Sequence, residues 1–260
     1  MKDNMPRINV LDHGFVILRN LAGPTRRTTD LGGMVVGGMR TSIERAFDAD
    51  DTDVANAARM SFGGSDKDRT YEDEMKLARY LMVNHHDTPF EMIQVWLDIK
   101  MPIFVARQLV RHRTQGINEI SGRYVKLPDE WYIPNVDDVM MQLAEKKQGG
   151  RPINLADQDE VQRATRYRER LNANCQRCYE SYEQSIADGI AMEQARLDLH
   201  LNHYTRWLST MNLRNTLHLL ALRDHGHAQG ENQQYAKAIT ELLDPHIPGL
   251  MQLYRDIIRS

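Results

Sequence analysis

The chain has 260 residues, of which 41% are hydrophobic and 27% charged, and its formal net charge is −3 at pH 7. This composition excludes an intrinsically disordered chain, and the acidic balance argues against a general nucleic-acid binder, which normally carries a basic surface. The N-terminal residues lack the apolar segment of a signal peptide, and no stretch approaches the roughly 18 apolar residues of a membrane-spanning helix, so we expect a cytoplasmic protein.

The N-terminal third predicts strands and helices around one irregular segment. Residues 8–18, INVLDHGFVIL, predict a strand, because they are rich in apolar and β-branched residues. Residues 20–48 hold glycine pairs, a proline and clustered threonines, which predicts a loop or an insertion. Helices are predicted over residues 51–60 and 71–84. Residues 92–101 alternate between apolar and polar side chains, which predicts a half-buried strand with Asp98 on its polar side.

The remaining elements are mostly helical. A helix is predicted over residues 103–112 after Pro102, and a short polar helix within residues 125–150. Further helices are expected over 157–187, 192–199, 212–223, 229–243 and 246–258, and residues 203–211 fit a strand or a helix. The chain therefore predicts one α+β domain over residues 1–260, helix-rich with a small, mostly antiparallel sheet.

A cationic cluster lies at the end of the helix predicted over 103–112. Arg107 and Arg111 are four residues apart and share one helix face. Arg111, His112 and Arg113 fall at the C-terminal end, where the helix dipole favours positive charge. Because a guanidinium binds phosphate through two parallel hydrogen bonds and also stacks on planar rings, the cluster predicts a site for a nucleotide or a dinucleotide cofactor.

The segment that follows adds polar groups of other kinds. Gly116 and Gly122 would let the backbone approach a ligand closely. Glu119, Ser121 and Arg123 alternate, so an extended backbone would place them on one side. The segment would then offer an acceptor, a hydroxyl and a cation to a single ligand.

The string RHRTQGINEIS consists of RHR, seven residues and then Ser, and it resembles the signature of the flavin-dependent thymidylate synthases. Other blocks resemble that family in the same order, over roughly residues 8–18 and 52–260: HHDTPFE, PIFVARQ, NLRNTLHLLALR and HAQGENQQYA. The resemblance implies a cytoplasmic methyltransferase of dTMP biosynthesis that converts dUMP to dTMP. Methylenetetrahydrofolate would donate the carbon, FAD reduced by NADPH would donate the hydride, and a homotetramer would form its active sites at subunit interfaces.

The resemblance also implies roles for individual residues. Those expected to contact FAD are Thr88, Arg111, His112, Arg113, Glu119, Asn212, Arg214 and His218. Those expected to bind dUMP are Gln108, Arg111, Glu119, Ser121, Gly122, Arg123, Arg196 and Arg223. Arg223 is the expected catalytic residue, because a cation beside the uracil N3 would favour ionisation of the ring and push electron density toward C5. No metal ligand is expected.

The two cysteines, Cys175 and Cys178, agree with this interpretation. An unrelated thymidylate synthase attacks uracil with a thiolate, which requires an activated cysteine in an electropositive pocket. Here both cysteines lie among Asn, Gln and Glu in a predicted polar helix. Their CxxC spacing permits a redox motif, but such motifs normally follow a strand and open a helix.

Two other functions are open from the residues alone. The clusters His85–His86 with Asp87 and His225–His227 with Asp224 are compatible with a metal-dependent nucleotide phosphohydrolase, although neither has a defined third ligand. An RNA-binding module is the second alternative, since aromatic residues are interleaved with cations between residues 107 and 131. The acidic net charge disfavours it, so we expect small-molecule substrates and no nucleic-acid partner.

Overall fold

The computed structural model describes residues 5–24, 35–36, 39–40, 49–63, 69–143, 149–226 and 228–259. An antiparallel sheet lies at its centre, with the order β1 (Arg7–Val10), β2 (Gly14–Ala22), β5 (Gln94–Pro102), β9 (Tyr204–Asn212) and β6 (Gly116–Glu119). Two short antiparallel pairs accompany it: β3 (Val35–Val36) with β4 (Met39–Arg40), and β7 (Met140–Gln142) with β8 (Gly150–Pro152).

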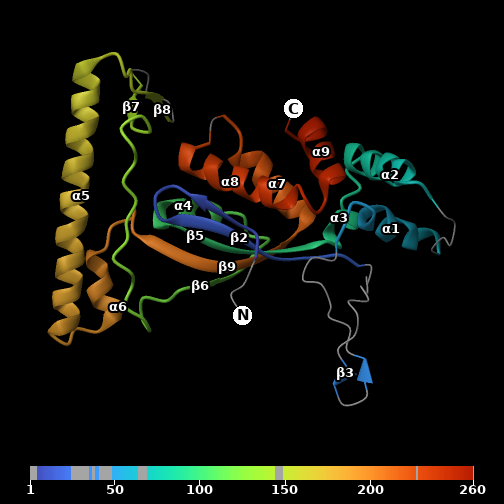
Figure 1. The fold of residues 1–260 in the computed structure, drawn as a ribbon, viewed down its shortest axis with the longest axis horizontal. Helices are drawn as coiled ribbons and strands as arrows, with labels where there is room; N and C mark the ends of the chain where they lie inside the picture. The colour runs from blue at the N-terminus through green and yellow to red at the C-terminus, as the bar shows by residue number, and fades with distance from the viewer. Residues whose placement is uncertain are drawn as a thin grey trace.

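Helices surround the sheet on one face and at both ends (Figure 1). Three helices pack near the sheet: α4 (Ile103–Leu109), α7 (Leu213–Arg223) and α8 (Gly230–Leu243). Four others lie toward one end of the molecule: α1 (Asp53–Arg59), α2 (Tyr71–Val83), α3 (Thr88–Glu91) and α9 (Pro248–Ile257). At the other end stand α5 (Gln158–Ala187) and α6 (Met192–Ala195), and short 3₁₀ helices cover Met60–Phe62 and Arg196–Asp198. Among the described residues, no helix combines the length and apolar character that crossing a bilayer requires.

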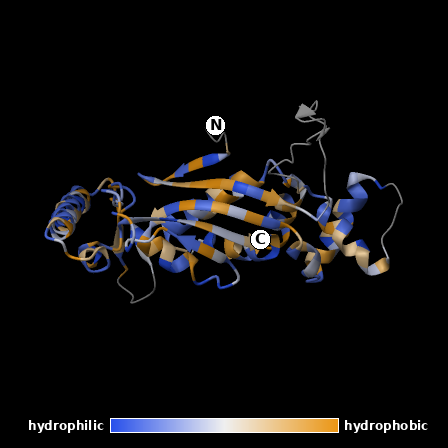
Figure 2. Ribbon diagram, turned by 90° about the horizontal axis from the view of Figure 1, so that it is seen from below, coloured by the Kyte–Doolittle hydropathy of each residue, from blue (hydrophilic) through white to orange (hydrophobic). Residues whose placement is uncertain are grey.

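The core forms where the sheet meets the helices. Val95, Leu97 and Ile99 alternate along β5 and are almost completely buried, together with Leu220 of α7 and Leu243 of α8. Burying one such side chain contributes about 1.5–3 kcal/mol. Figure 2 shows the hydrophobic and hydrophilic residues alternating along the strands, as a sheet with one covered face requires. The helix-rich α+β prediction is confirmed.

Two predicted elements in the N-terminal region were wrong in their limits. The strand expected over residues 8–18 is a hairpin of β1 and β2, joined by a turn in which Leu11 has a positive φ of 58°. The apolar residues on either side of the turn hid it in the sequence. The loop expected over residues 20–48 begins later, because β2 continues to Ala22 along β5. Within the rest of that prediction, residues 25–34, 37–38 and 41–48 lie outside the described residues.

The helix expected over residues 103–112 ends at Leu109. The Gln115 side-chain amide donates a hydrogen bond to the Leu109 carbonyl (2.7 Å), and the His112 amide donates to the same carbonyl (3.1 Å). These bonds close the helix end before the cationic cluster, so Arg111, His112 and Arg113 occupy a turn instead of a helical face. The expected pairing of Arg107 and Arg111 on one helix face was therefore wrong.

Two further corrections concern residues 125–150 and Asp98. No helix forms in the described residues 125–143 and 149–150, where β7 and β8 pair instead. Asp98 is only 5% exposed, although it was expected on a polar strand face. It is buried because β5 is a central strand, and Arg19 of β2 and Arg206 of β9 bind its carboxylate from either side. The segment 203–211, which fitted either structure, forms the strand β9.

Candidate functional site

The last turn of α7 brings Arg223 against the turn that follows α4. Its Nε donates a hydrogen bond to His112 Nε2 (3.1 Å), and its Nη2 donates to the Gln108 backbone carbonyl (3.1 Å). Burial lowers the pKa of Arg223 from its ordinary value, because a partly dehydrated guanidinium loses solvation of its charge. The result is a cation held in one orientation by two acceptors.

His112 can accept this bond because its imidazole is neutral. Burial, followed by the charges of Arg223 and His218, lowers the pKa of His112 to about 4. With Nε2 acting as the acceptor, the single ring proton lies on Nδ1. The His218 ring lies edge-on to His112, with 6.3 Å between the ring centroids. His112 in the turn after α4 therefore forms one polar group with Arg223 and His218 of α7.

His218 also borders a hollow of about 430 Å³ between α3, α7 and the end of α9. Arg214, one turn before His218 on α7, lies on the same side of the hollow and forms an ion pair with Asp87 (Nε to Oδ2, 3.1 Å). Thr88 follows Asp87 as the first residue of α3. The remaining lining is largely apolar: Met82, Phe90, Leu217, Ile257 and Ile258. Such a hollow suits a planar ring system that carries polar substituents.

Asn212 has a structural task in this arrangement. It ends β9 and is the N-cap residue of α7, where its side-chain oxygen accepts a hydrogen bond from the Asn215 amide (2.9 Å). The cap fixes the start of the helix that carries Arg214, His218 and Arg223. The side-chain nitrogen of Asn212 remains as a donor toward a ligand.

A second group of the predicted residues lies around the turn after β6. Arg123 forms an exposed ion pair with Glu193 (3.0 Å), and the Arg123 amide donates to Ser121 Oγ (3.3 Å). Gly122 packs so closely that an added Cβ would lie 3.2 Å from Cδ of Arg196. A side chain at position 122 would therefore press on the arginine expected to bind dUMP.

Glu119 ends β6 and accepts a hydrogen bond from the Thr205 hydroxyl (2.5 Å). The expected alternation of Glu119, Ser121 and Arg123 along an extended strand was wrong beyond Glu119. The backbone turns at Ser121, whose carbonyl accepts from the Tyr124 and Val125 amides (3.1 and 3.2 Å). The Ile120 amide still donates to the Arg206 carbonyl of β9 (2.9 Å), but the Tyr204 amide at the end of β9 donates to the Glu130 carbonyl (3.1 Å), so that end of the strand pairs with a later segment.

Arg111 and Arg113 are exposed, and neither has a carboxylate within 4 Å in the part of the chain that is described. They are available cations next to His112. No hydrogen bond or ion pair between described residues joins the group around Arg223, His112, His218 and Arg214 to the group around Ser121, Gly122, Arg123 and Arg196. Within the described residues, the predicted site residues thus fall into two groups that no hydrogen bond or ion pair connects.

The two carboxylates of the metal alternative are engaged in ion pairs. Asp87 binds Arg214, and the buried Asp224 binds Arg259 (3.0 Å). Across the described ranges, no group of three or more His, Cys, Asp or Glu side chains has an arrangement that could hold a metal ion, and the side chain of His227 lies outside those ranges. Cys175 and Cys178 are free thiols within α5, and Cys175 lies against Asn202 (Sγ to Oδ1, 3.5 Å).

Sequence reasoning missed three residues that hold the predicted ones. Asp87 binds Arg214, Thr205 binds Glu119 and Glu193 binds Arg123. Asp87 adjoins Thr88 in the HHDTPFE block, so its place at the site could have been predicted from the sequence. Thr205 and Glu193 are distant from their partners in the sequence, and no local pattern could have linked them.

Together, the helix-covered sheet, the hollow beside His218 and the partly dehydrated Arg223 describe an α+β protein whose candidate site suits anionic, ring-containing molecules. Residues 43–249 match the family described as thymidylate synthase complementing protein. The chain is 37% identical over 251 residues to the flavin-dependent thymidylate synthase of Ruegeria pomeroyi, and 38% identical over 250 residues to that of Gluconobacter oxydans. Each alignment covers 95% of this chain and 72% of the relative.

The fold is similar to that of a solved protein, the UMP/dUMP methylase PolB from Streptomyces cacaoi. In its 5-Br UMP complex the TM-score is 0.74 at 25% identity, covering 98% of this chain and 99% of that one. In its 5-Br dUMP complex the TM-score is 0.75 at 24% identity. The chain belongs to the family of flavin-dependent thymidylate synthases, which confirms the resemblance carried by the RHR motif and its companion blocks.

Proposed function

We propose that this chain is a flavin-dependent thymidylate synthase that methylates dUMP to dTMP. The single observation that carries the proposal, in a chain of this family, is the partly buried guanidinium of Arg223, which two acceptors hold in place. A cation held in this way by two neutral acceptors stabilises negative charge that develops on a bound ring. A protein thiolate is not required, and burial raises the pKa of the Cys175 thiol, which disfavours the thiolate there.

The proposed cofactor is FAD, and the residues of the hollow fit a flavin nucleotide. Met82, Phe90 and Leu217 offer apolar surface, while Arg214 and His218 offer polar groups. The exposed Arg111 and Arg113 are suited to the pyrophosphate, because each guanidinium can donate two parallel hydrogen bonds. When bound, the reduced flavin supplies the hydride, and methylenetetrahydrofolate supplies the carbon.

The chain's own residues would bind and polarise dUMP. Ser121, Arg123 and Arg196 offer donors to its phosphate, and Gly122 leaves room for Arg196. Arg223 would lie at the uracil edge and stabilise the ring after N3 loses its proton. The neutral His112 imidazole holds that guanidinium in place and adds no competing charge, which favours a single orientation in the Michaelis complex.

We propose that the physiological unit is a homotetramer with active sites between subunits. The division of the predicted residues into two groups supports this, since one chain's group would meet the other group of a neighbouring chain. NADPH as reductant, a cytoplasmic location and a single domain with an insertion in residues 20–48 stay predictions from the sequence.

The test is the visible absorption spectrum of the purified protein, followed by an assay for dTMP with dUMP, methylenetetrahydrofolate and NADPH. We expect a flavin spectrum and dTMP formation. Arg223→Ala should keep the flavin and lose turnover, whereas the matched control Arg79→Ala, on the exposed face of α2, should retain both. A protein that neither carries nor takes up FAD would disprove the proposal.

A further inference from the structure

The outer face of α5 is a surface that the proposed chemistry does not use. Figures 1 and 2 both place this helix at one end of the molecule. Its inner face is occupied: Tyr182 Oη accepts from the Leu127 amide (3.0 Å), and Tyr179 Oη donates to the Leu127 carbonyl (3.0 Å). These bonds fix the rotation of the helix about its axis, so that its other face is directed away from the chain's own core.

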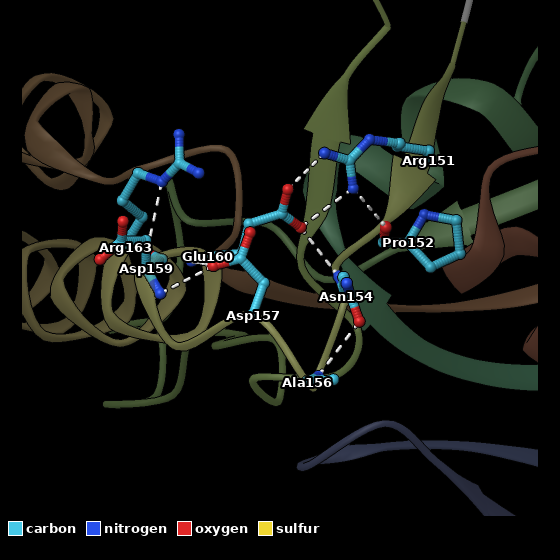
Figure 3. Close-up of polar contacts among 8 residues, drawn as sticks. All are labelled: Arg151, Pro152, Asn154, Ala156, Asp157, Asp159, Glu160 and Arg163. Atoms are coloured by element: carbon cyan, nitrogen blue, oxygen red, sulfur yellow. Dashed lines mark hydrogen bonds and ion pairs between the residues drawn. The ribbon is translucent and has the colours of Figure 1, made fainter.

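The N-terminal end of α5 is also fixed. Asp157 caps the helix by accepting from the Asp159 and Glu160 amides (2.9 and 3.3 Å). Figure 3 shows the Glu160 carboxylate bound by the Arg151 guanidinium and by the Asn154 amide (2.8 Å). A helix of 30 residues held at its start and along its inner face presents a rigid outer face about 45 Å long.

Five residues define this outer face: Arg166, Glu169, Ala173, Arg177 and Glu180. With 3.6 residues per turn they share the side of α5 opposite to the buried Ala164, Cys175 and Tyr182. All five are exposed. The face thus carries both signs of charge around one small residue.

The charges on this face have few partners within the chain. Neither Arg166 nor Glu169 has a hydrogen bond or an ion pair to a side chain in the described ranges. Arg177 binds only the Asn174 side chain, and Glu180 only the Gln176 amide (2.9 Å). Arg166 and Arg170 are four residues apart, where like charges repel. An outside partner with matching charges would relieve this repulsion.

Read from its other end, the order of charges on the outer face of α5 places a positive side chain opposite each negative one. Arg166 and Glu180 each lie seven residues from Ala173, and Glu169 and Arg177 each lie four residues from it. We propose that α5 pairs antiparallel with α5 of a second copy of this chain, around a two-fold axis at Ala173. Arg166 then faces Glu180 of the partner subunit, and Glu169 faces Arg177 of the partner subunit. Because a two-fold interface repeats every contact, four ion pairs form.

Other occupants fit this face less well. A parallel pair of α5 helices would place Arg166 against its own copy and Glu169 against its own copy, which is repulsive. Nucleic acid requires a basic surface without interspersed carboxylates, yet Glu169 and Glu180 lie within the face. The small side chain of Ala173 at the crossing lets two helix axes approach closely. The proposal deepens the proposed homotetramer by naming one of its contacts, and it does not depend on the flavin chemistry.

The first test reverses the charges and measures association of the full chain by sedimentation velocity. Arg166→Glu and Glu180→Arg should each raise the dissociation constant of one association step about tenfold or more, since each removes two ion pairs and creates two repulsions. The double variant Arg166→Glu/Glu180→Arg should restore the dissociation constant of the natural chain. The control Arg79→Glu makes the same change of net charge on α2, and it should leave association unchanged.

The second test is a cross-link. Ala173→Cys, in a background with Cys178→Ser, should form a disulfide-linked dimer on mild oxidation, because two copies of position 173 meet at the axis. Ala187→Cys, which is exposed on the same helix fourteen residues away, should stay monomeric on the same gel. Unchanged association of both single charge variants, failure of the double variant to recover, or equal cross-linking of both cysteines would overturn the proposal. Flavin spectra of the same samples report separately on the proposed function.

Discussion

His112 shows how one neutral side chain can decide the position of a charged one. Its Nε2 is the only side-chain acceptor that Arg223 Nε has among the described residues. Because burial keeps the imidazole neutral near pH 7, the ring can accept this bond. The direction of the Arg223 guanidinium, the proposed catalytic group, therefore depends on a residue that the family resemblance assigns to cofactor contact.

We predict that His112→Leu lowers kcat about 10–100-fold, because a displaced catalytic group loses orientation. His112→Gln supplies another acceptor and should lose less than about tenfold by the same argument. Steady-state dTMP formation, measured at saturating cofactor, separates the two variants. Equal losses in both would show that the accepted hydrogen bond is not the function of His112.

Asp98 illustrates a residue whose burial the strand pattern could not reveal. Its Oδ1 accepts from Arg206 Nε (2.7 Å), and its Oδ2 accepts from Arg19 Nε (3.0 Å). Burial raises the pKa of Asp98, but the hydrogen bonds from Arg206 and Arg19 outweigh it, and the pKa is lowered overall. The carboxylate thus joins three neighbouring strands.

Asp98→Asn should lower the free energy of unfolding by about 1–3 kcal/mol, since it removes one acceptor atom and the charge that both arginines face. Urea unfolding followed by circular dichroism measures the loss. Arg206→Lys is the companion variant and should cost less, because it keeps the charge but not the two parallel hydrogen bonds. A fully stable Asp98→Asn would indicate that the arginines are satisfied by solvent.

At the scale of elements, the long helix α5 was predicted almost to the residue. Asp157 at its start is a strong N-cap residue, and the helical pattern continues without a proline or glycine to Ala187. The cationic turn after α4 was not predicted, because its helical pattern continues past the point where Gln115 closes the helix. Local patterns identify elements well, but a single side chain just beyond an element, here Gln115, can decide where it ends.

The Glu160 network predicts a pH effect on stability. The hydrogen bond from Arg151 and then that from the Asn154 amide lower the pKa of Glu160 to about 2. In the unfolded chain the ordinary value is about 4.3. The folded state therefore gains stability above that value, and this gain is lost as pH falls toward the folded pKa.

Glu160→Gln should therefore be less stable than the natural chain at pH 7, and the difference should shrink as pH is lowered from about 4.5 toward 3. Thermal unfolding across this range tests it. The exposed Glu72→Gln on α2 serves as the control and should show a small difference. A deficit of constant size at every pH would contradict the assigned role of the ionised carboxylate.

At the scale of the whole molecule, the two groups of site residues predict a shared active site. Arg223 belongs to one group and Arg196 to the other. If a neighbouring chain completes each site, a variant defective in one group can be complemented by a variant defective in the other. A site complete within one chain would allow no such rescue.

We predict that Arg223→Ala and Arg196→Ala are each nearly inactive, and that co-expression of the two, purified through different tags, restores part of the activity. At some interfaces of the mixed assembly, the intact Arg223 of one chain then meets the intact Arg196 of another chain. Mixtures of each variant with itself are the controls. Failure of stable mixed tetramers to regain activity would place the complete site in one chain.

By itself, the sequence determined the class of the fold, the family and most helices, and it predicted the site residues, because periodicity, caps and a spaced motif are local properties. Only the tertiary structure decided that Asp98 is buried, that the RHR segment leaves the helix and that Arg223 rests on His112. The helix end depends on Gln115, six positions from Leu109, but the other two facts depend on contacts between residues up to 111 positions apart. Such contacts form when the sheet brings strands and helices together, and no local pattern encodes them.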